Sequence, residues 1–226
     1  MRLGEHRTNV DDIFDYLHDE ILSLRLKPGE KISEAEIAAR FGVSRQPVRD
    51  AFSRLANLDL LLIRPQRATE VKRFSAREIE KSRFVRAAVE TEVLRRAAKL
   101  CDMEGAKLLD AALADQQRAI EEVDVDGFGA LDYDFHRRLC LIAGVDYAFE
   151  VITSEKIKVD RLCILGLSKE DRMPQLVADH RAIAAAVKAN DAERAVELGM
   201  LHLSRLDDTI TRIAHINAHY FEPALD

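Results

Sequence analysis

The sequence has little glycine or proline and no long hydrophobic run. Only nine Gly and five Pro occur among its 226 residues, whereas 47% of the residues are apolar. A chain with so few turn-forming residues and so much apolar content is expected to be mainly α-helical and to bury two cores. No uninterrupted apolar stretch approaches the roughly 18 residues that a membrane-spanning helix needs. No membrane partner is therefore expected.

Signals for export and for disulfide bonds are also missing. The N-terminal residues MRLGEHRTNVDDIF carry several charges and lack the apolar core of a signal peptide. The three cysteines, Cys101, Cys140 and Cys163, are widely spaced and form no CxxC pair. An odd number of scattered cysteines fits reduced thiols, most of them core fillers. These absences predict a cytoplasmic protein.

Charge is distributed unevenly along the chain. The formal net charge is −6 and the pI is near 5.7, yet residues 40–73 hold eight Lys or Arg against three Asp or Glu. Residues 75–226 hold 21 basic against 28 acidic side chains. Attraction for the phosphates of a nucleic acid is therefore expected from one short stretch only.

Two short helices separated by a tight turn are predicted within this basic stretch. The segment SEAEIAARF has apolar side chains at helical spacing, and Gly42 follows it. In the next helix, Ser44 is a favourable N-cap and Pro47 lies in the first turn, where proline is tolerated. The side chains that point away from its apolar face are Arg45, Gln46 and Arg49. This arrangement predicts a helix-turn-helix.

Two strands joined by a Pro-containing turn are predicted in the following segment, LLLIRPQRATEVKRF. This β-wing carries four basic side chains, Arg64, Arg67, Lys72 and Arg73. A pair of arginines one turn apart is by itself usually only a solvated helix face. Two helices, a turn and a basic wing in this order instead predict a winged helix-turn-helix DNA-binding domain over residues 1–74.

From Ser75 onward the apolar residues recur at helical spacing throughout. The predicted helices cover residues 76–100, 103–122, 127–143, 146–166, 174–189 and 192–218. The expected N-caps among them are Asp102, Asp126 and Asp191. We expect residues 75–226 to form an antiparallel α-helical bundle that follows the first domain almost without a linker.

The most specific chemical feature of this bundle is a set of one carboxylate and three imidazoles on three predicted helices. These residues are Asp132, His136, His180 and His202. Each histidine lies on an apolar helix face, and a buried neutral imidazole must satisfy one donor and one acceptor. One carboxylate with three imidazoles is a normal ligand set for a divalent metal ion such as zinc or nickel. Either a shared metal ion or three separately hydrogen-bonded core histidines would explain the pattern.

The chain resembles the GntR family of transcription regulators, and within it the FadR-like branch whose effector domain is called FCD. The resemblance rests on ISEAEIAARFGVSRQPVRDAFSRL in the first domain and on VRAAVE, DYDFH, DHRAI and MLHLSRL in the second. It covers essentially the whole chain. It implies that Asp132, His136, His180 and His202 bind a metal ion inside the helical bundle.

The resemblance also implies contacts of the recognition helix in the major groove of double-stranded DNA and of the wing toward the minor groove. The expected DNA-binding residues are Ser44, Arg45, Gln46, Arg49, Arg64 and Arg67. Two residues depart from the family pattern. Ala35 stands where some relatives carry a basic contact, and Ala68 occupies the wing turn where glycine is common. Because alanine resists positive φ, a different turn is expected at the wing tip.

Relatives with this metal set commonly bind small carboxylates, sugar acids or hydroxy acids, so the resemblance implies an effector of this class. Our candidate carboxylate partner is Arg86, because a guanidinium can form two parallel hydrogen bonds with a carboxylate. Alternatively, Arg86 and Glu90 form only an ion pair one helical turn apart. The expected protein is a homodimeric repressor that reads a palindromic operator and responds to its ligand.

Two other classes of protein would use the same residues. A metal-dependent hydrolase would activate water with the Asp and His set. Neither a nucleophile with a base nor a phosphate-binding glycine loop accompanies that set, so no enzyme is predicted. A DNA-binding regulator with a purely structural metal would need no small-molecule effector.

Overall fold

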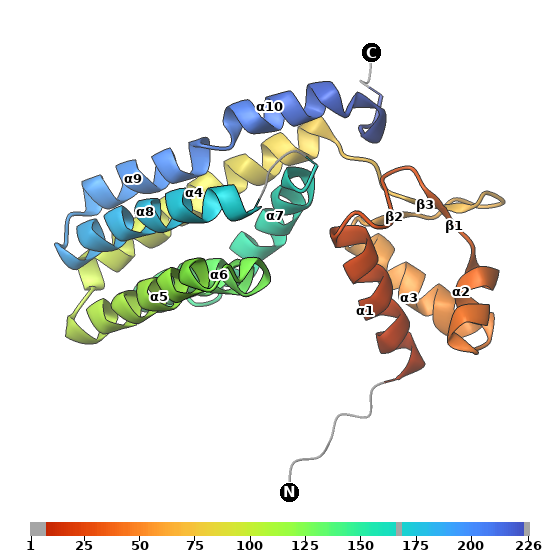
Figure 1. Cartoon of the computed structure of the whole chain (residues 1–226), viewed down its shortest axis with the longest axis horizontal. Coiled ribbons are helices and arrows are strands. Elements are labelled where there is room, and N and C mark those ends of the chain that lie inside the picture. The colour runs from red at the N-terminus through yellow and green to blue at the C-terminus, as the bar shows by residue number, and fades with distance from the viewer. Residues whose placement is uncertain (1–7, 166–168, 224–226) are drawn as a thin grey trace, which may run out of the picture. The chain divides into compact units, whose positions relative to one another are not determined.

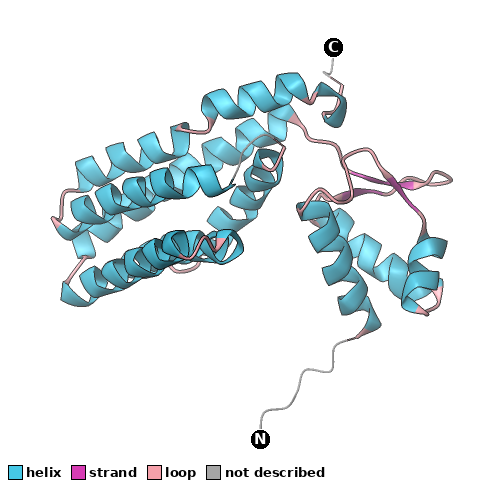
Figure 2. Ribbon diagram, in the orientation of Figure 1, coloured by secondary structure: helices cyan, strands magenta, loops and turns pink. Residues whose placement is uncertain are grey.

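The computed structural model describes residues 8–165 and 169–223, and the chain divides into two compact units (Figure 1). One unit consists of Met1–Ala76 together with Asn217–Asp226, and the other of Arg77–Ile216. Helices dominate both units, and every strand of the described residues belongs to the first (Figure 2). The predicted fold class, mainly α, is confirmed.

Three helices build the core of the first unit. They are α1 (Asn9–Leu22), α2 (Glu34–Phe41) and α3 (Arg45–Asn57). A capping box between Thr8 and Asp11 starts α1, and the Ser33 side chain accepts a hydrogen bond from the Glu36 amide at the start of α2. Gly42 ends α2 with φ 65°, a left-handed conformation that costs glycine little. This residue produces the tight turn into α3.

A small antiparallel sheet completes the winged helix-turn-helix. Its strands are β1 (Lys31–Ile32), β2 (Leu61–Leu62) and β3 (Thr69–Val71), in the spatial order β1-β3-β2. Leu61 lies opposite Val71, and both side chains are buried in the same apolar core as α1, α2 and α3. The hairpin of β2 and β3 is the predicted wing.

The turn at the wing tip runs from Arg64 to Arg67. The Arg67 amide donates a hydrogen bond of 3.3 Å to the Arg64 carbonyl, and Gln66 adopts a φ of 57°. Proline at the second position and positive φ at the third are the features of a type II turn. The left-handed residue is therefore Gln66, and Ala68 is spared the conformation that alanine resists.

The segment that follows α10 belongs to the first unit. After the short 3-10 helix η1 (Ala218–Tyr220), Phe221 forms a parallel bridge with Phe74. The Phe74 amide donates to the Tyr220 carbonyl at 2.9 Å, and the Glu222 amide donates to the Phe74 carbonyl at 2.8 Å. The C-terminal segment is thus attached just beyond β3, at the end of the wing.

Seven α-helices make up the described part of the second unit. They are α4 (Ala76–Leu100), α5 (Met103–Glu121), α6 (Val125–Ile142), α7 (Ala148–Cys163), α8 (Lys169–Lys188), α9 (Ala192–Ser204) and α10 (Asp207–Ile216). Asp102 and Asp191 cap α5 and α9, as predicted. In Figure 1, α5 and α6 lie side by side, as do α8 and α9.

Three predicted boundaries in this unit are wrong. Asp124 rather than Asp126 caps α6, because the Asp124 side chain accepts a hydrogen bond of 2.9 Å from the Gly127 amide. Helix α8 begins at Lys169, ahead of the predicted start at residue 174. The long last helix is interrupted at Arg205, so that α9 and α10 are separate. Within the described ranges, no helix is both long and apolar enough to span a bilayer.

Candidate DNA-binding face and candidate metal centre

The N-terminal end of α3 presents its polar side chains to solvent. Ser44 occupies the N-cap position as predicted, but its hydroxyl makes no capping hydrogen bond. Arg45, Gln46 and Arg49 are all exposed, while Val48 on the opposite face is fully buried. Helix amides that no side chain covers can bind phosphate oxygens. This end of α3 therefore combines backbone donors with two guanidiniums.

Two of these side chains already interact with nearby acids. Arg49 Nε lies 2.9 Å from the Glu34 carboxylate on α2, and Gln46 donates a hydrogen bond of 2.9 Å to Asp50. The Arg49 side chain remains 55% exposed, and an exposed pair of this kind contributes only about 0–1 kcal/mol. The Arg49 guanidinium can therefore exchange Glu34 for another anion at little cost. The ion pair holds Arg49 on the outer face of the helix-turn-helix and not in its interior.

The wing is less positive than its sequence suggests, because acidic residues partly neutralise it. Arg64 pairs with Glu70 at 3.1 Å, and Lys72 pairs with Asp59 at 2.5 Å. Arg67, in the tip turn, is exposed. Of the two predicted wing contacts, Arg64 is therefore paired with an acid, whereas Arg67 is exposed at the tip turn.

The three predicted histidines converge in the second unit. His136 comes from α6, His180 from α8 and His202 from α9, and one ring nitrogen of each lies within 4.8 Å of the others. All three rings are buried, with His180 fully inaccessible. Three nitrogens this close from three separate helices form a cluster of the size that a single metal ion occupies.

Each imidazole is oriented by an acceptor at its Nδ1 atom. Glu90 lies 3.0 Å from His136 Nδ1 and Gln116 lies 3.0 Å from His180 Nδ1. Asp179 lies 3.4 Å from His202 Nδ1. An acceptor at Nδ1 favours the tautomer that leaves the Nε2 lone pair free, as in most histidine–metal sites. None of these three partners was predicted from the sequence, since they come from α4, α5 and α8.

Two buried nitrogen atoms lack the partner that a buried polar atom needs. Among the described residues, His136 Nε2 and His180 Nε2 have no hydrogen-bond partner. Burial lowers the pKa of His180 well below its ordinary value, and the neighbouring His202 lowers it further. The ring is therefore neutral, which is the form that binds a metal. The histidines fit a bound divalent ion better than they fit three separate hydrogen-bonded core residues.

Asp132 lies beside this cluster, and its carboxylate also forms an ion pair with a lysine. One of its carboxylate oxygens lies 3.6 Å from His180 Nε2, and the other lies 2.9 Å from Lys156 Nζ. The same ammonium lies 2.5 Å from Asp160. Burial raises the pKa of Asp132, but Lys156 and the neighbouring histidines together outweigh burial and hold that pKa below its usual value. Asp132 is thus ionised and poised beside the histidines, with Lys156 as its present partner.

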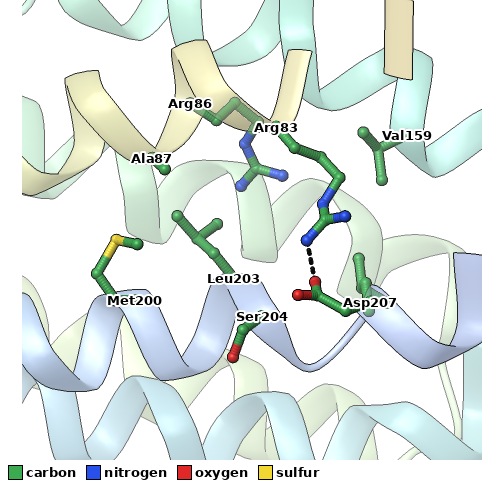
Figure 3. Close-up of a pocket in the computed structure, with 9 residues that line it drawn as sticks. Arg83, Arg86, Ala87, Val159, Met200, Leu203, Ser204 and Asp207 are labelled. Atoms are coloured by element: carbon green, nitrogen blue, oxygen red, sulfur yellow. Dashed lines mark hydrogen bonds and ion pairs between the residues drawn. The ribbon is translucent and has the colours of Figure 1, made fainter. Parts of the chain in front are cut away.

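The sequence offered two interpretations of Arg86, an ion pair with Glu90 and a place in a ligand-binding pocket, and the structure is compatible with both. Its Nε and Nη2 atoms lie 2.9 Å and 2.8 Å from Glu90 Oε1, so the ion pair within α4 exists. Arg86 also lines a cavity of about 130 Å³ between α4, α7, α9 and the start of α10. Figure 3 shows Arg86 and Arg83 reaching into this space from adjacent turns of α4.

Comparison with known proteins assigns both units. Residues 9–71 match the family described as bacterial regulatory proteins, gntR family, and residues 83–205 match the FCD domain. The HTH-type transcriptional repressor RspR of Escherichia coli (strain K12) is 35% identical over 210 residues, covering 92% of each chain. The chain belongs to the GntR family.

Other GntR-family relatives agree with this assignment. The gluconate operon transcriptional repressor of Bacillus subtilis (strain 168) is 26% identical, with 87% of this chain and 82% of the relative covered. A putative GntR regulator from Rhodococcus sp. RHA1 has the same fold, with a TM-score of 0.69 and 22% identity over 92% of this chain and 99% of that one. This GntR-family chain is a DNA-binding transcription regulator and not an enzyme. Its FCD domain is of a kind that commonly binds metal.

Proposed function

We propose that this GntR-family protein is a homodimeric repressor that releases or rearranges its operator DNA when a small carboxylate or sugar acid binds beside a metal ion. The observation that carries the proposal is the cluster of His136, His180 and His202 next to a cavity lined by Arg86. A metal with an open coordination position and an arginine a short distance away together suit a ligand that has a carboxylate.

In this proposal, residues 1–74 bind DNA and residues 75–226 bind the effector and form the dimer. The α3 side chains approach bases and phosphates in the major groove, and the wing approaches the minor groove. The residues assigned to these contacts are Ser44, Arg45, Gln46, Arg49, Arg64 and Arg67. Two copies of α3 in a homodimer match a palindromic operator. The regulator acts where this DNA is, in the cytoplasm.

We assign the metal to Asp132, His136, His180 and His202, with zinc or nickel as the ion that suits these ligands. When bound, the ion supplies a Lewis-acidic position for ligand oxygen atoms. The protein's own contribution is to hold the imidazoles through Glu90, Gln116 and Asp179 and to exclude water around them. A comparison of metal content in wild type and His136→Ala, with the exposed His215→Ala as control, tests the assignment. Equal metal content in His136→Ala and wild type would reject it.

The nature of the effector is supported by the side chains of the cavity and by the names of relatives. Arg86 is buried and positively charged, and its guanidinium has five N–H donors, more than the pairing with Glu90 uses, so it can also bind an incoming carboxylate. One relative is named a repressor of a gluconate operon and another a probable repressor of a D-xylose utilization operon. These names favour a ligand derived from a sugar.

DNA binding measured by fluorescence anisotropy tests the whole proposal. The zinc-loaded protein is titrated onto an operator selected from random DNA, with and without each member of a panel of sugar acids and hydroxy acids. We expect at least one acid to change the dissociation constant for the operator by tenfold or more, as is typical of allosteric coupling. If no acid changes this constant while His136→Ala still loses its metal, the metal is structural and the regulator needs no effector.

A further inference from the structure

Two ion pairs hold the junction between α9 and α10. One of them contacts the histidine cluster, and the other lies in the cavity that Arg86 lines. Arg205, which ends α9, binds Asp179 through two hydrogen bonds of 2.7 Å and 2.9 Å. Asp179 also accepts from Nδ1 of His202, one of the clustered histidines. On the other side of the junction, Asp207, the first residue of α10, pairs with Arg83 of α4.

The pair of Arg83 and Asp207 lies within the cavity that Arg86 lines (Figure 3). Arg83 and Arg86 extend from the same helix into the same space. They differ in accessibility, because the side chain of Arg86 is 7% exposed whereas those of Arg83 and Asp207 are 34% and 48% exposed. The cavity thus contains one guanidinium already bound to an internal acid, Glu90, and another bound to an acid that solvent can reach.

We propose that Arg83 is a second anion-binding residue of this cavity, and that the carboxylate of the effector displaces Asp207 from it. This inference rests on the proposed function, since it names where a ligand of that class would bind. A partly exposed ion pair contributes little to stability, because solvent screens it. The carboxylate of a ligand can therefore replace Asp207 as the partner of Arg83 at small cost, while the other groups of the ligand lie near Arg86.

Displacement of Asp207 changes how α10 is held. Asp207 lies in the first turn of α10, and its release removes an ion pair between this turn and α4. Helix α10 runs directly into the segment 217–222, which is hydrogen-bonded to Phe74 at the end of the wing. The chain itself therefore connects the cavity to the DNA-binding unit through α10. A ligand that binds the released state better shifts the protein toward that state.

Isothermal titration calorimetry on the zinc-loaded, full-length protein tests the site with three probes, namely acetate, D-gluconate and inorganic phosphate. Asp207→Asn keeps the shape of the acid and removes its charge, so we expect it to bind the carboxylates at least threefold more tightly than wild type. Asp208→Asn is the matched control, since Asp208 is an exposed acid in the same helical turn. Arg83→Gln should weaken carboxylate binding at least threefold.

Amide hydrogen exchange over residues 207–222 tests the second step. We expect D-gluconate to increase exchange in this segment of the wild type, and Asp207→Asn to show the increase without any ligand. Asp208→Asn should exchange as the wild type does.

Several results would overturn the inference. If Asp207→Asn binds carboxylates no more tightly than Asp208→Asn does, Asp207 does not compete with the ligand for Arg83. Phosphate binding more tightly than both carboxylates would reject the ligand class. If an acid releases DNA from the wild-type protein and also binds Arg83→Gln with unchanged affinity, the proposed function stands and the role of Arg83 is rejected. Conversely, carboxylate binding that depends on Arg83 but never alters DNA affinity would support the site and reject the proposed function.

Discussion

Glu90 accepts a hydrogen bond from Nδ1 of His136 at 3.0 Å while it also binds Arg86 at 2.8 Å. One buried carboxylate therefore links the proposed effector arginine to a proposed metal ligand. Burial raises the pKa of Glu90, but its interactions with His136 and with the Arg86 guanidinium lower it overall. Glu90 is thus ionised, and it fixes both the ring of His136 and the guanidinium of Arg86.

Replacement of Glu90 by glutamine should weaken metal binding. Compared with the carboxylate, the neutral amide holds the His136 ring less firmly and makes its imidazole a less basic metal ligand. Loss of such an outer partner typically costs about 10–100-fold in metal affinity. Competition with a chromophoric zinc chelator measures this change. Glu92→Gln, at an exposed position of the same helix, is the control and should retain wild-type affinity. Equal affinities for both variants would contradict the role of Glu90.

Replacement of Lys156 by methionine should increase the stabilisation that zinc gives. In the wild type, Lys156 occupies one carboxylate oxygen of Asp132 and repels a nearby cation. Without the ammonium, both carboxylate oxygens of Asp132 are available to the metal. Zinc should then bind more tightly and raise the unfolding temperature further. Thermal unfolding with and without zinc measures the shift, and Lys158→Met, which removes a partly exposed lysine of the same helix, serves as control. A zinc-induced shift no larger than that of wild type would contradict this competition.

Replacement of Arg49 by alanine should weaken operator binding by about 1–3 kcal/mol, as expected for a guanidinium that contacts a base or phosphate. Binding should also become less dependent on salt if a phosphate contact is lost. Anisotropy titrations at several salt concentrations measure both effects. Arg95→Ala removes an exposed arginine of the second unit and should bind as the wild type does. Unchanged binding by Arg49→Ala would remove α3 from the DNA interface.

The capping box of α1 should make part of the stability of the first unit depend on pH. Hydrogen bonds from Arg54 and Thr8 lower the pKa of Asp11 from 3.8 to about 2. Because the folded-state pKa is the lower one, this stabilisation is complete above the ordinary value and is lost as pH falls from about 4 toward 2. Urea denaturation of wild type and Asp11→Asn should differ at pH 6 and converge in acid. A difference independent of pH would show that the charge of Asp11 is not responsible.

The sequence alone was sufficient for features that depend on neighbouring residues. The turn at Gly42, the N-caps at Asp102 and Asp191 and the exposed face of α3 all follow from local rules of helix initiation, termination and periodicity. The histidine set could be predicted in the same way, because each histidine lies on an apolar face of its own helix. Competition between two nearby acids was harder to judge from the sequence, and Asp124 rather than Asp126 caps α6.

Only the tertiary structure decided how those faces meet. Glu90, Gln116 and Asp179 are polar residues on separate helices, and nothing in their spacing along the chain identifies them as partners of particular imidazoles. The same holds for Lys156 beside Asp132 and for the return of the C-terminal segment to Phe74. Local sequence determines which way a side chain points from its own helix, whereas the packing of helices distant in the chain determines what that side chain meets.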